Sequence, residues 1–357
     1  MSNYINPTVW NDIQSTNATN EKRFAELGII DAVVKSTASV DYISPSQKQQ
    51  FTEISSLRDI QIPVIKDQTI EVISSPSFNI PQNLAETANY SFQRYNVFSG
   101  FRFYPASFAN NQLDAIFYRD SVMNNVAYAM ANEIEGILET QLEARKTQTL
   151  GYTTEISQGD GTFVFGSNKL TINKAAQGET MFDYLDQLMV ANELPGRYRV
   201  VTNRNGLSLA KSKYAQYGSN NERNLQAAGM LEAERQHQTG NISPSSGENL
   251  SGFMIRDGAI GVYENFPYDF RNGTVIGRRK WSVSNVALPY IGMKCNIYTN
   301  SEPTEATALI SSGSDSNLKM SHFEEMGIWA SFTVVYRYNS DLTTRPNDIV
   351  QIVGTTT

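Results

Sequence analysis

The chain has two histidines, His237 and His322, and a zinc site or a Ser-His-Asp triad would have to use one of them. Neither lies at a metal-ligand spacing from a cysteine, an aspartate or the other histidine. Each has polar or charged neighbours along the chain, a setting typical of surface histidines. The sequence therefore predicts no catalytic histidine and no metal site.

Carboxylate and thiol chemistry is no better supported by the residue spacing. Glu133 and Glu135 are two positions apart in a helical pattern, so they point to different sides and cannot form a glycosidase-like pair by themselves. Glu139 and Glu143 are most simply a solvated helix face. Cys295 is the one cysteine, which excludes an intramolecular disulfide, and its strand-like run GMKCNIYT favours a small buried residue. We expect no catalytic residue and no cofactor.

Motifs that could bind an anion are weak. The glycine-rich stretch GDGTFVFG lacks the Lys-Ser/Thr of a phosphate loop and a following helix, so it predicts a turn. The basic clusters RYR at 197–199 and GRRK at 277–280 are either solvated charge or contacts to phosphate or to an acidic neighbouring subunit. The net charge of −7 argues against a surface built to hold nucleic acid.

The longest periodic stretch is SVMNNVAYAMANEIEGILETQLEARKT, in which apolar residues recur at steps of three and four. At 1.5 Å per residue this helix would be roughly 40 Å long. Gly136 in its interior costs about 1 kcal/mol relative to alanine, so the helix must be held by packing. We expect one helix from Leu113 to Lys146, packed through Met130 and Ile134 on a sheet that contains a strand from Ile328 to Tyr338.

The segment from Leu57 to Pro105 has the alternation of two β-strands, one before and one after the stretch SSPSFNIPQNL. The two prolines of that stretch exclude a central strand and predict a projecting tip. An isolated two-stranded ribbon is marginal in water, so this one is expected to lie on another subunit. The candidate inter-subunit contacts are Phe78, Ile80 and Pro81.

The rest of the chain alternates between polar, β/α and β-rich segments. Residues 1–55 are polar apart from LGIIDAVV and predict an arm that drapes over another surface. From Glu179 the pattern predicts a helix, a strand and a helix, then a polar helix in NERNLQAAGMLEAERQH. From Trp281 it predicts long strands in VALPYIGMKCNIYT and MGIWASFTVVYRYN. The fold class is α+β. No apolar run could cross a membrane, and no signal peptide is visible.

In this order of elements the chain resembles the major capsid proteins of tailed bacteriophages, whose Hong Kong 97-type fold is shared with encapsulins. The resemblance rests on LRDIQIPVIKDQTIEV as the start of the extended E-loop and FYRDSVMNNVAYAMANEIEGILE as the spine helix. FDYLDQLMVANELPGRYRVVTNRNGLSLAKS resembles the opening of the axial domain. The resemblance implies an N-terminal arm at 1–55, an E-loop at 56–105, a peripheral domain at 106–178 and 283–357, and an axial domain at 179–282.

The resemblance also implies a function. The chain would be a structural subunit, not an enzyme, that self-assembles through pentameric and hexameric capsomers into an icosahedral shell enclosing double-stranded DNA. Its partners would be copies of itself, the DNA through non-specific contact, and scaffold, portal and decoration proteins, with no membrane. Assembly would take place in the host cytoplasm and the mature location would be the virion. The N-terminus would be either processed or dependent on a separate scaffold. Lys66 lies near the β excursion, but no motif identifies crosslink partners.

Two alternatives stay open. An encapsulin-like cellular compartment shell would have the same fold with an enzyme cargo instead of a genome. A β-rich carbohydrate-binding protein or enzyme would account for the eighteen tyrosines and seventeen phenylalanines, although most of these fall on strand alternation.

Overall fold

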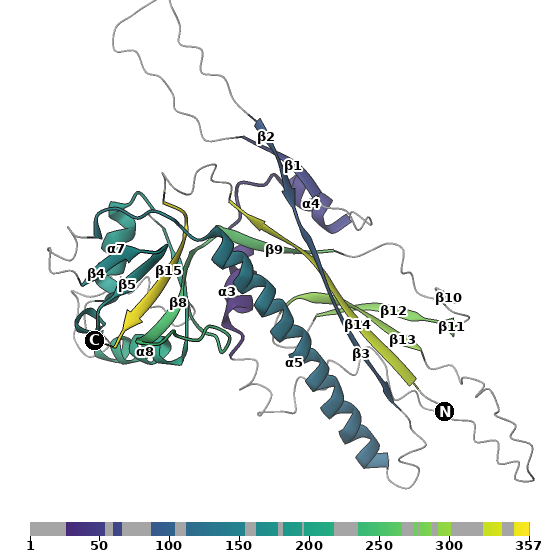
Figure 1. The fold of residues 1–357 in the computed structure, drawn as a ribbon. Coiled ribbons are helices and arrows are strands. Elements are labelled where there is room, and N and C mark those ends of the chain that lie inside the picture. Colours follow the sequence, from purple (N-terminus) through teal and green to yellow (C-terminus); the bar gives the residue numbers. More distant parts are fainter. Residues whose placement is uncertain are drawn as a thin grey trace, which may run out of the picture.

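The computed structural model describes residues 26–53, 60–65, 87–103, 112–153, 162–177, 181–194, 196–217, 235–265, 275–276, 279–287, 292–300, 324–337 and 346–356. Within these residues, a five-stranded and a six-stranded sheet lie side by side along the molecule (Figure 1). Helices cover faces of both sheets, which confirms the α+β class. No helix of the described part is long and apolar enough to cross a membrane.

The five-stranded sheet is antiparallel and has β14 at its centre. Its strands are β12 (Ser282–Ala287), β13 (Lys294–Asn300), β14 (Glu324–Tyr336), β3 (Arg94–Phe103) and β9 (Ile260–Glu264). β3 pairs with one edge of β14, and β13 and β9 pair with successive parts of the other edge. The register sets Ala330 opposite Val97 and so puts the apolar residues of both strands on one face.

The helix α5 (Gln112–Arg145) covers that face and runs along the sheet (Figure 1). Met130 and Ile134 are buried in one core with Ile328 and Phe332 of β14. The predicted helix and its packing face are therefore confirmed. The helix begins one residue before the predicted start and ends one residue before the predicted end. Tyr338, the predicted last residue of the strand, lies outside the described residues.

One predicted strand is wrong. VALPYIGMKCNIYT contributes to two strands, β12 and β13, which pair antiparallel, so the chain reverses direction between them. Gly292 has a φ of +71°, a conformation that L side chains rarely adopt, and a proline stands three positions before it. These two residue types break a strand, whatever the apolar content around them.

The six-stranded sheet is mixed and has the order β4-β5-β15-β8-β6-β7. Its strands are β4 (Phe163–Gly166), β5 (Lys169–Ile172), β15 (Ile349–Thr355), β8 (Glu248–Arg256), β6 (Tyr198–Thr202) and β7 (Gln236–Gln238). The helices α7 (Met181–Ala191) and α8 (Arg204–Tyr217) contribute to a core on one face, and the short helix η2 (Lys174–Ala176) follows β5. The predicted order of helix, strand and helix after Glu179 is confirmed.

Strand membership in this sheet crosses the sequence ranges. β4 and β5 come from the range 106–178 and β15 from the range 283–357, yet all three pair in one sheet with β6 and β8 of the range 179–282. β15 lies between β5, to which it is parallel, and β8, to which it is antiparallel. The chain therefore returns to this sheet for its last strand.

Two further predictions fail locally. The described end of GDGTFVFG is the strand β4, and the turn lies beyond it at Ser167 and Asn168, whose φ angles are 52° and 59°. Phe163 is buried in the core, and this burial favours the strand over a turn. The described end of NERNLQAAGMLEAERQH is the strand β7, which pairs with β6 rather than continuing a helix.

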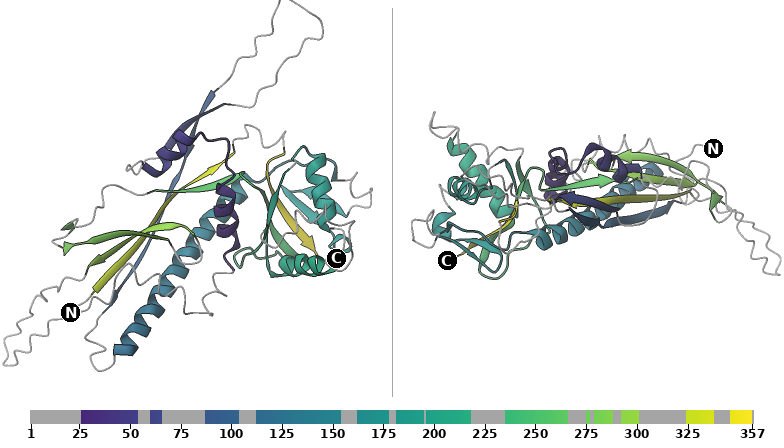
Figure 2. Two further views of the ribbon diagram at one scale, coloured as in Figure 1. Left: turned by 180° about the vertical axis from the view of Figure 1, so that it is seen from behind. Right: turned by 90° about the horizontal axis from the view of Figure 1, so that it is seen from above.

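The N-terminal segment forms two helices, α3 (Gly28–Thr37) and α4 (Pro45–Glu53). Four apolar residues of α3, from Ile29 to Val33, are buried in the core that also contains Met130 and Ile134 of α5. α4 packs through Phe51 on Tyr263 of β9, on the side of the strands away from α5 (Figure 2). Within the expected arm, α3 thus belongs to the main core, because its apolar residues have helical spacing, and Phe51 of α4 belongs to a separate apolar cluster.

Candidate functional site

The part of the E-loop candidate that the structure describes is an antiparallel ribbon of β1 (Ile60–Ile65) and β2 (Thr87–Phe92). Among the described strands it forms a separate two-stranded sheet. One residue separates β2 from β3, so the ribbon continues the edge strand of the five-stranded sheet past α4 (Figure 1). The two predicted arms are confirmed over these residues. The candidate contacts Phe78, Ile80 and Pro81 lie outside the described residues.

The base of the ribbon is fixed to the rest of the chain by an apolar cluster. Ile62 and Phe92 are each 1% exposed and pack with Phe51 of α4 and Tyr336 of β14. The Phe92 ring lies 5.8 Å from Phe51 and 5.4 Å from Tyr336, both edge to face. Aromatic pairs in this geometry contribute about 0.5–1.5 kcal/mol beyond their buried area. We call Phe51, Phe92, Tyr336 and Ile62 the ribbon root.

The C-terminal end of α5 is joined to the ribbon root through Arg145. Its guanidinium carbon lies 3.9 Å from the centre of the Tyr336 ring, and Nη2 donates a 2.7 Å hydrogen bond to the Tyr336 hydroxyl. Next to it, Lys146 donates a 2.6 Å hydrogen bond to Gln351 of β15. The long helix therefore connects the root of the ribbon to the last strand of the second sheet.

A buried carboxylate lies at the middle of α5. Glu135 has no exposed surface, while Glu133 is exposed, so the two point to different sides as predicted. The Glu135 carboxylate accepts hydrogen bonds from the backbone N–H groups of Ile29 (3.3 Å) and Ile30 (3.2 Å) and from the Thr239 hydroxyl (2.6 Å). Leu27, the residue before α3, provides no side-chain cap, so Glu135 caps α3 from another helix. Burial is the main influence and raises the pKa of Glu135 to about 7 against the three hydrogen bonds that lower it.

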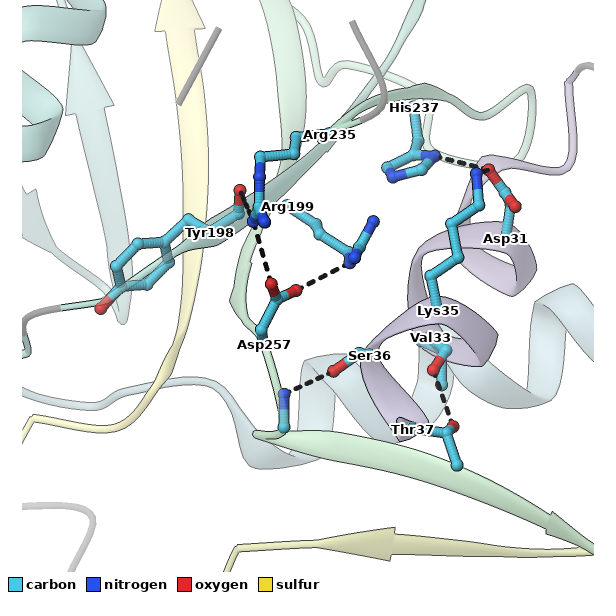
Figure 3. Close-up of polar contacts among 11 residues, drawn as sticks. Asp31, Val33, Lys35, Ser36, Thr37, Tyr198, Arg199, Arg235, His237 and Asp257 are labelled. Atoms are coloured by element: carbon cyan, nitrogen blue, oxygen red, sulfur yellow. Dashed lines mark hydrogen bonds and ion pairs between the residues drawn. The ribbon is translucent and has the colours of Figure 1, made fainter. Parts of the chain in front are cut away.

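Polar contacts also join α3 to the second sheet (Figure 3). Nδ1 of His237 on β7 lies 2.9 Å from a carboxylate oxygen of Asp31, which also accepts a 2.8 Å hydrogen bond from Lys35. Partial burial raises the pKa of Asp31, but the hydrogen bonds from His237 and Lys35 outweigh it and lower that pKa to about 2. His237 is 6% exposed, so the prediction of a surface histidine is wrong. Its polar neighbours alternate with it along a strand, which turns His237 toward α3. His322 lies outside the described residues.

The C-terminal turn of α3 is held by backbone donors of the segment between β8 and β9 and of β9 itself. The Gly258 N–H donates to the Ser36 hydroxyl and the Val262 N–H to the Thr37 hydroxyl, each at 2.9 Å. Gly258 has a φ of +86°, and a Cβ there would lie 2.4 Å from the Ser39 carbonyl oxygen. Only glycine allows this close approach.

One of the predicted basic clusters forms an internal ion pair. Nε of Arg199 lies 2.7 Å from one carboxylate oxygen of Asp257, and Nη1 of Arg235 lies 3.0 Å from the other (Figure 3). The Arg199 side chain is 12% exposed, so it is neither solvated charge nor a free contact for phosphate. Arg197 is exposed. Of the second cluster, residues 277–278 lie outside the described part and the side chains of 279–280 are not described.

Cys295 is buried as predicted, and its thiol donates a 3.3 Å hydrogen bond to the Val286 carbonyl oxygen. Burial raises the pKa of this thiol to about 12, which disfavours the nucleophilic thiolate. Glu143 is exposed, as expected for a solvated face, whereas Glu139 is partly buried, and burial raises its pKa. In the described part of the chain, no three acidic, histidine or cysteine residues are grouped so that they could hold a metal ion.

No protein-family model and no curated protein matches the sequence. Among solved structures, the chain is similar to the capsid structure of the cyanophage P-SCSP1u, with 14% identity and a TM-score of 0.45 over 86% of each chain. It is similar to a structure from Mycobacterium phage Che8, with 10% identity and a TM-score of 0.44 over 87% of this chain and 89% of that one. The head structure of Helicobacter pylori bacteriophage KHP40 matches with 8% identity and a TM-score of 0.39 over 85% and 87%. All three structures come from phages.

Proposed function

We propose that this chain is a structural shell subunit of the tailed-phage major capsid type, which self-assembles through pentamers and hexamers into an icosahedral head around double-stranded DNA. The observation that carries the proposal is the ribbon of β1 and β2, whose root is packed in the subunit's own core while its strands pair only with each other among the described strands. A ribbon of this kind is marginal unless it finds a further surface.

The architecture supplies the other requirement of a shell, a stiff plate. α5 packs along the five-stranded sheet, in a core that also contains Phe253 and Ile255 of the six-stranded sheet. One continuous core therefore joins both sheets, and a force applied at the ribbon root is transmitted through Arg145 and Tyr336 to α5. Close-packed interiors transmit such strain with little compression.

The strand pairing favours a modified division into units. We propose that the axial unit consists of α7, β6, α8, β7 and β8 together with β4, β5 and β15, because these strands share one sheet, and α7 and α8 contribute to its core. The peripheral unit then consists of α5, β3, β9, β12, β13 and β14, with the E-loop ribbon attached at β3.

Assembly in the host cytoplasm, enclosure of DNA by non-specific contact, and cooperation with scaffold, portal and decoration proteins belong to the same proposal. The net charge of −7 is consistent with a shell that encloses DNA without binding it tightly. An encapsulin-like compartment shell is the alternative with the same architecture.

Sedimentation of the purified full-length chain, with absorbance at 260 and 280 nm, tests the proposal. Particles of several megadaltons that carry nuclease-protected DNA support a phage head, and particles that carry protein cargo without DNA favour a compartment shell. A chain that stays monomeric, even when the neighbouring genes are co-expressed, contradicts both the phage head and the compartment shell.

A further inference from the structure

Three elements that are far apart in the sequence meet at the carboxyl group of Glu135. The first two N–H donors belong to the start of α3, and the third donor, Thr239, follows β7 of the second sheet. Glu135 itself belongs to the helix of the first sheet. A side chain with no exposed surface thus holds together the two sheets and the helix between them.

We propose that the protonation state of the Glu135 carboxyl group controls the junction, that is, the contacts among α5, α3 and the Thr239 segment. These contacts are stable while the carboxyl group carries a proton, and they loosen when it loses the proton. The inference concerns the folded subunit and does not depend on shell assembly.

The contact geometry fits both protonation states. The Glu135 carboxylate accepts a 2.6 Å hydrogen bond from the Thr239 hydroxyl. A carboxylic acid can instead donate to the same hydroxyl oxygen. The other carboxyl oxygen accepts from the Ile30 N–H in both states. The Asn241 N–H, 3.2 Å from the Thr239 hydroxyl oxygen, keeps that hydroxyl in place. Proton exchange therefore changes the charge of the junction and reverses the Thr239 hydrogen bond, while the Ile29 N–H, which donates to the same carboxyl oxygen as Thr239, keeps a weaker acceptor.

Burial of the Glu135 carboxyl group disfavours its ionised form. Burial raises the pKa of Glu135 from its usual 4.5 to about 7, so the closed junction holds a proton at pH values where a solvated glutamate has lost it. Opening then releases a proton between about pH 5 and pH 7, and the opening constant rises roughly tenfold per pH unit in that range. Above pH 7 both states are ionised and the opening constant levels off. The stabilisation is complete below the open-state pKa and is lost as the pH rises through the closed-state pKa.

Other titratable groups face the junction from each element. Glu139 lies one turn further along α5, and its charge raises the pKa of Glu135. Asp31 and Lys35 on α3 and His237 on β7 form their own chain of contacts. Glu26, before α3, lies beside Gly240. His237 is the ionisable group of β7 in contact with α3, so the test has to separate it from Glu135.

Amide hydrogen exchange of the full-length chain at pH 5, 6, 7 and 8 measures the opening directly, with each rate divided by the intrinsic rate at that pH. We expect the protection factors of residues 28–33 to fall roughly tenfold per unit from pH 5 to pH 7 and to stay level from pH 7 to pH 8. Amides of β8 serve as the internal reference. A flat profile for residues 28–33 between pH 5 and pH 7 overturns the proposal.

Variants identify the group that titrates. Glu135→Gln should give a profile independent of pH, whereas the exposed neighbour variant Glu133→Gln and the variant His237→Gln should keep the wild-type slope. A slope that survives Glu135→Gln, or that disappears in His237→Gln, contradicts the assignment. Should Glu135→Gln not fold, Thr239→Val replaces it: removing a donor to the ionised form should move the sloping range to higher pH, and an unmoved range overturns the proposal.

Discussion

The guanidinium of Arg145 lies over the ring of Tyr336, with 3.9 Å between its central carbon and the ring centre, and it also hydrogen-bonds the Tyr336 hydroxyl. Arg145 is the last residue of α5, and Tyr336 is the last residue of β14. The contact therefore joins the ends of the longest described helix and the longest described strand, next to the base of the ribbon. Tyr336 also packs edge to face against Phe92, which carries the contact into the ribbon.

Replacing Arg145 with methionine should lower the free energy of unfolding by about 1–2 kcal/mol, the sum of a cation–π contact and one hydrogen bond. Arg145→Lys keeps the charge but loses the planar stacking, so its cost should be intermediate. Chemical denaturation measures both, with Gln148→Met, an exposed site three residues on, as the control. Equal stabilities of all three variants would show that the contact contributes nothing.

Replacing Ile134 with aspartate should prevent soluble folding. Ile134 has no exposed surface and packs in the core with β14. An unpaired buried charge costs about 4 kcal/mol or more, a large part of the stability of a domain. Solubility and circular dichroism give the outcome, and Ala129→Asp on the exposed face of α5 controls for helix propensity. A soluble, folded Ile134→Asp protein would mean that the stripe is not core.

Acid should weaken the attachment of α3 to β7 through Asp31. The pKa of Asp31 is lowered from 3.8 to about 2, so its contribution is present above pH 4 and is lost as the pH falls toward 2. His237→Gln keeps a donor for Asp31 but removes the coulombic interaction by which His237 lowers the pKa of Asp31, so the loss of stability between pH 4 and pH 2 should be smaller in the variant. Urea unfolding at four pH values over this range measures the difference, and identical pH slopes would remove Asp31–His237 from the account.

Deleting Ser75 to Asn83 and closing the chain with Asn-Gly should leave a folded subunit that no longer forms stable shells. The deleted residues lie outside the described part, and the prediction rests on the ribbon root, which the deletion leaves intact. Covering about 100 Å² of apolar surface per subunit would contribute roughly 2–3 kcal/mol, repeated in every copy. Sedimentation decides: shells of normal size and stability from a folded, shortened chain would exclude the ribbon tip as an assembly clamp.

The sequence was sufficient for elements whose apolar spacing is long and regular. α5 and β14 each provide many repeats of one period, and α7, β6 and α8 are bounded by Pro-Gly and by a capping asparagine, so local signals identify them. The sequence did not predict the hairpin of β12 and β13, because its proline and glycine stand inside an apolar run.

The polar junction could not be predicted for a different reason. Glu135 contacts Ile29, Ile30 and Thr239 across more than 100 positions, and such spacing leaves no periodic signal. The helical period puts Glu135 on the same side as Ala131 and Leu138 of the apolar stripe and not on the side of Glu133, which is the available indication of a buried carboxylate. β7 is three residues long, too short for alternation to show that His237 faces inward.

The measurement that tests the central claim most directly is a cryo-electron microscopy reconstruction of the assembled full-length protein. The account predicts closed icosahedral shells in which the ribbon of β1 and β2 extends from its root at Phe92 and Tyr336 onto an adjacent copy. Discrete monomers at all concentrations, or shells in which the ribbon folds back on its own subunit, would contradict it.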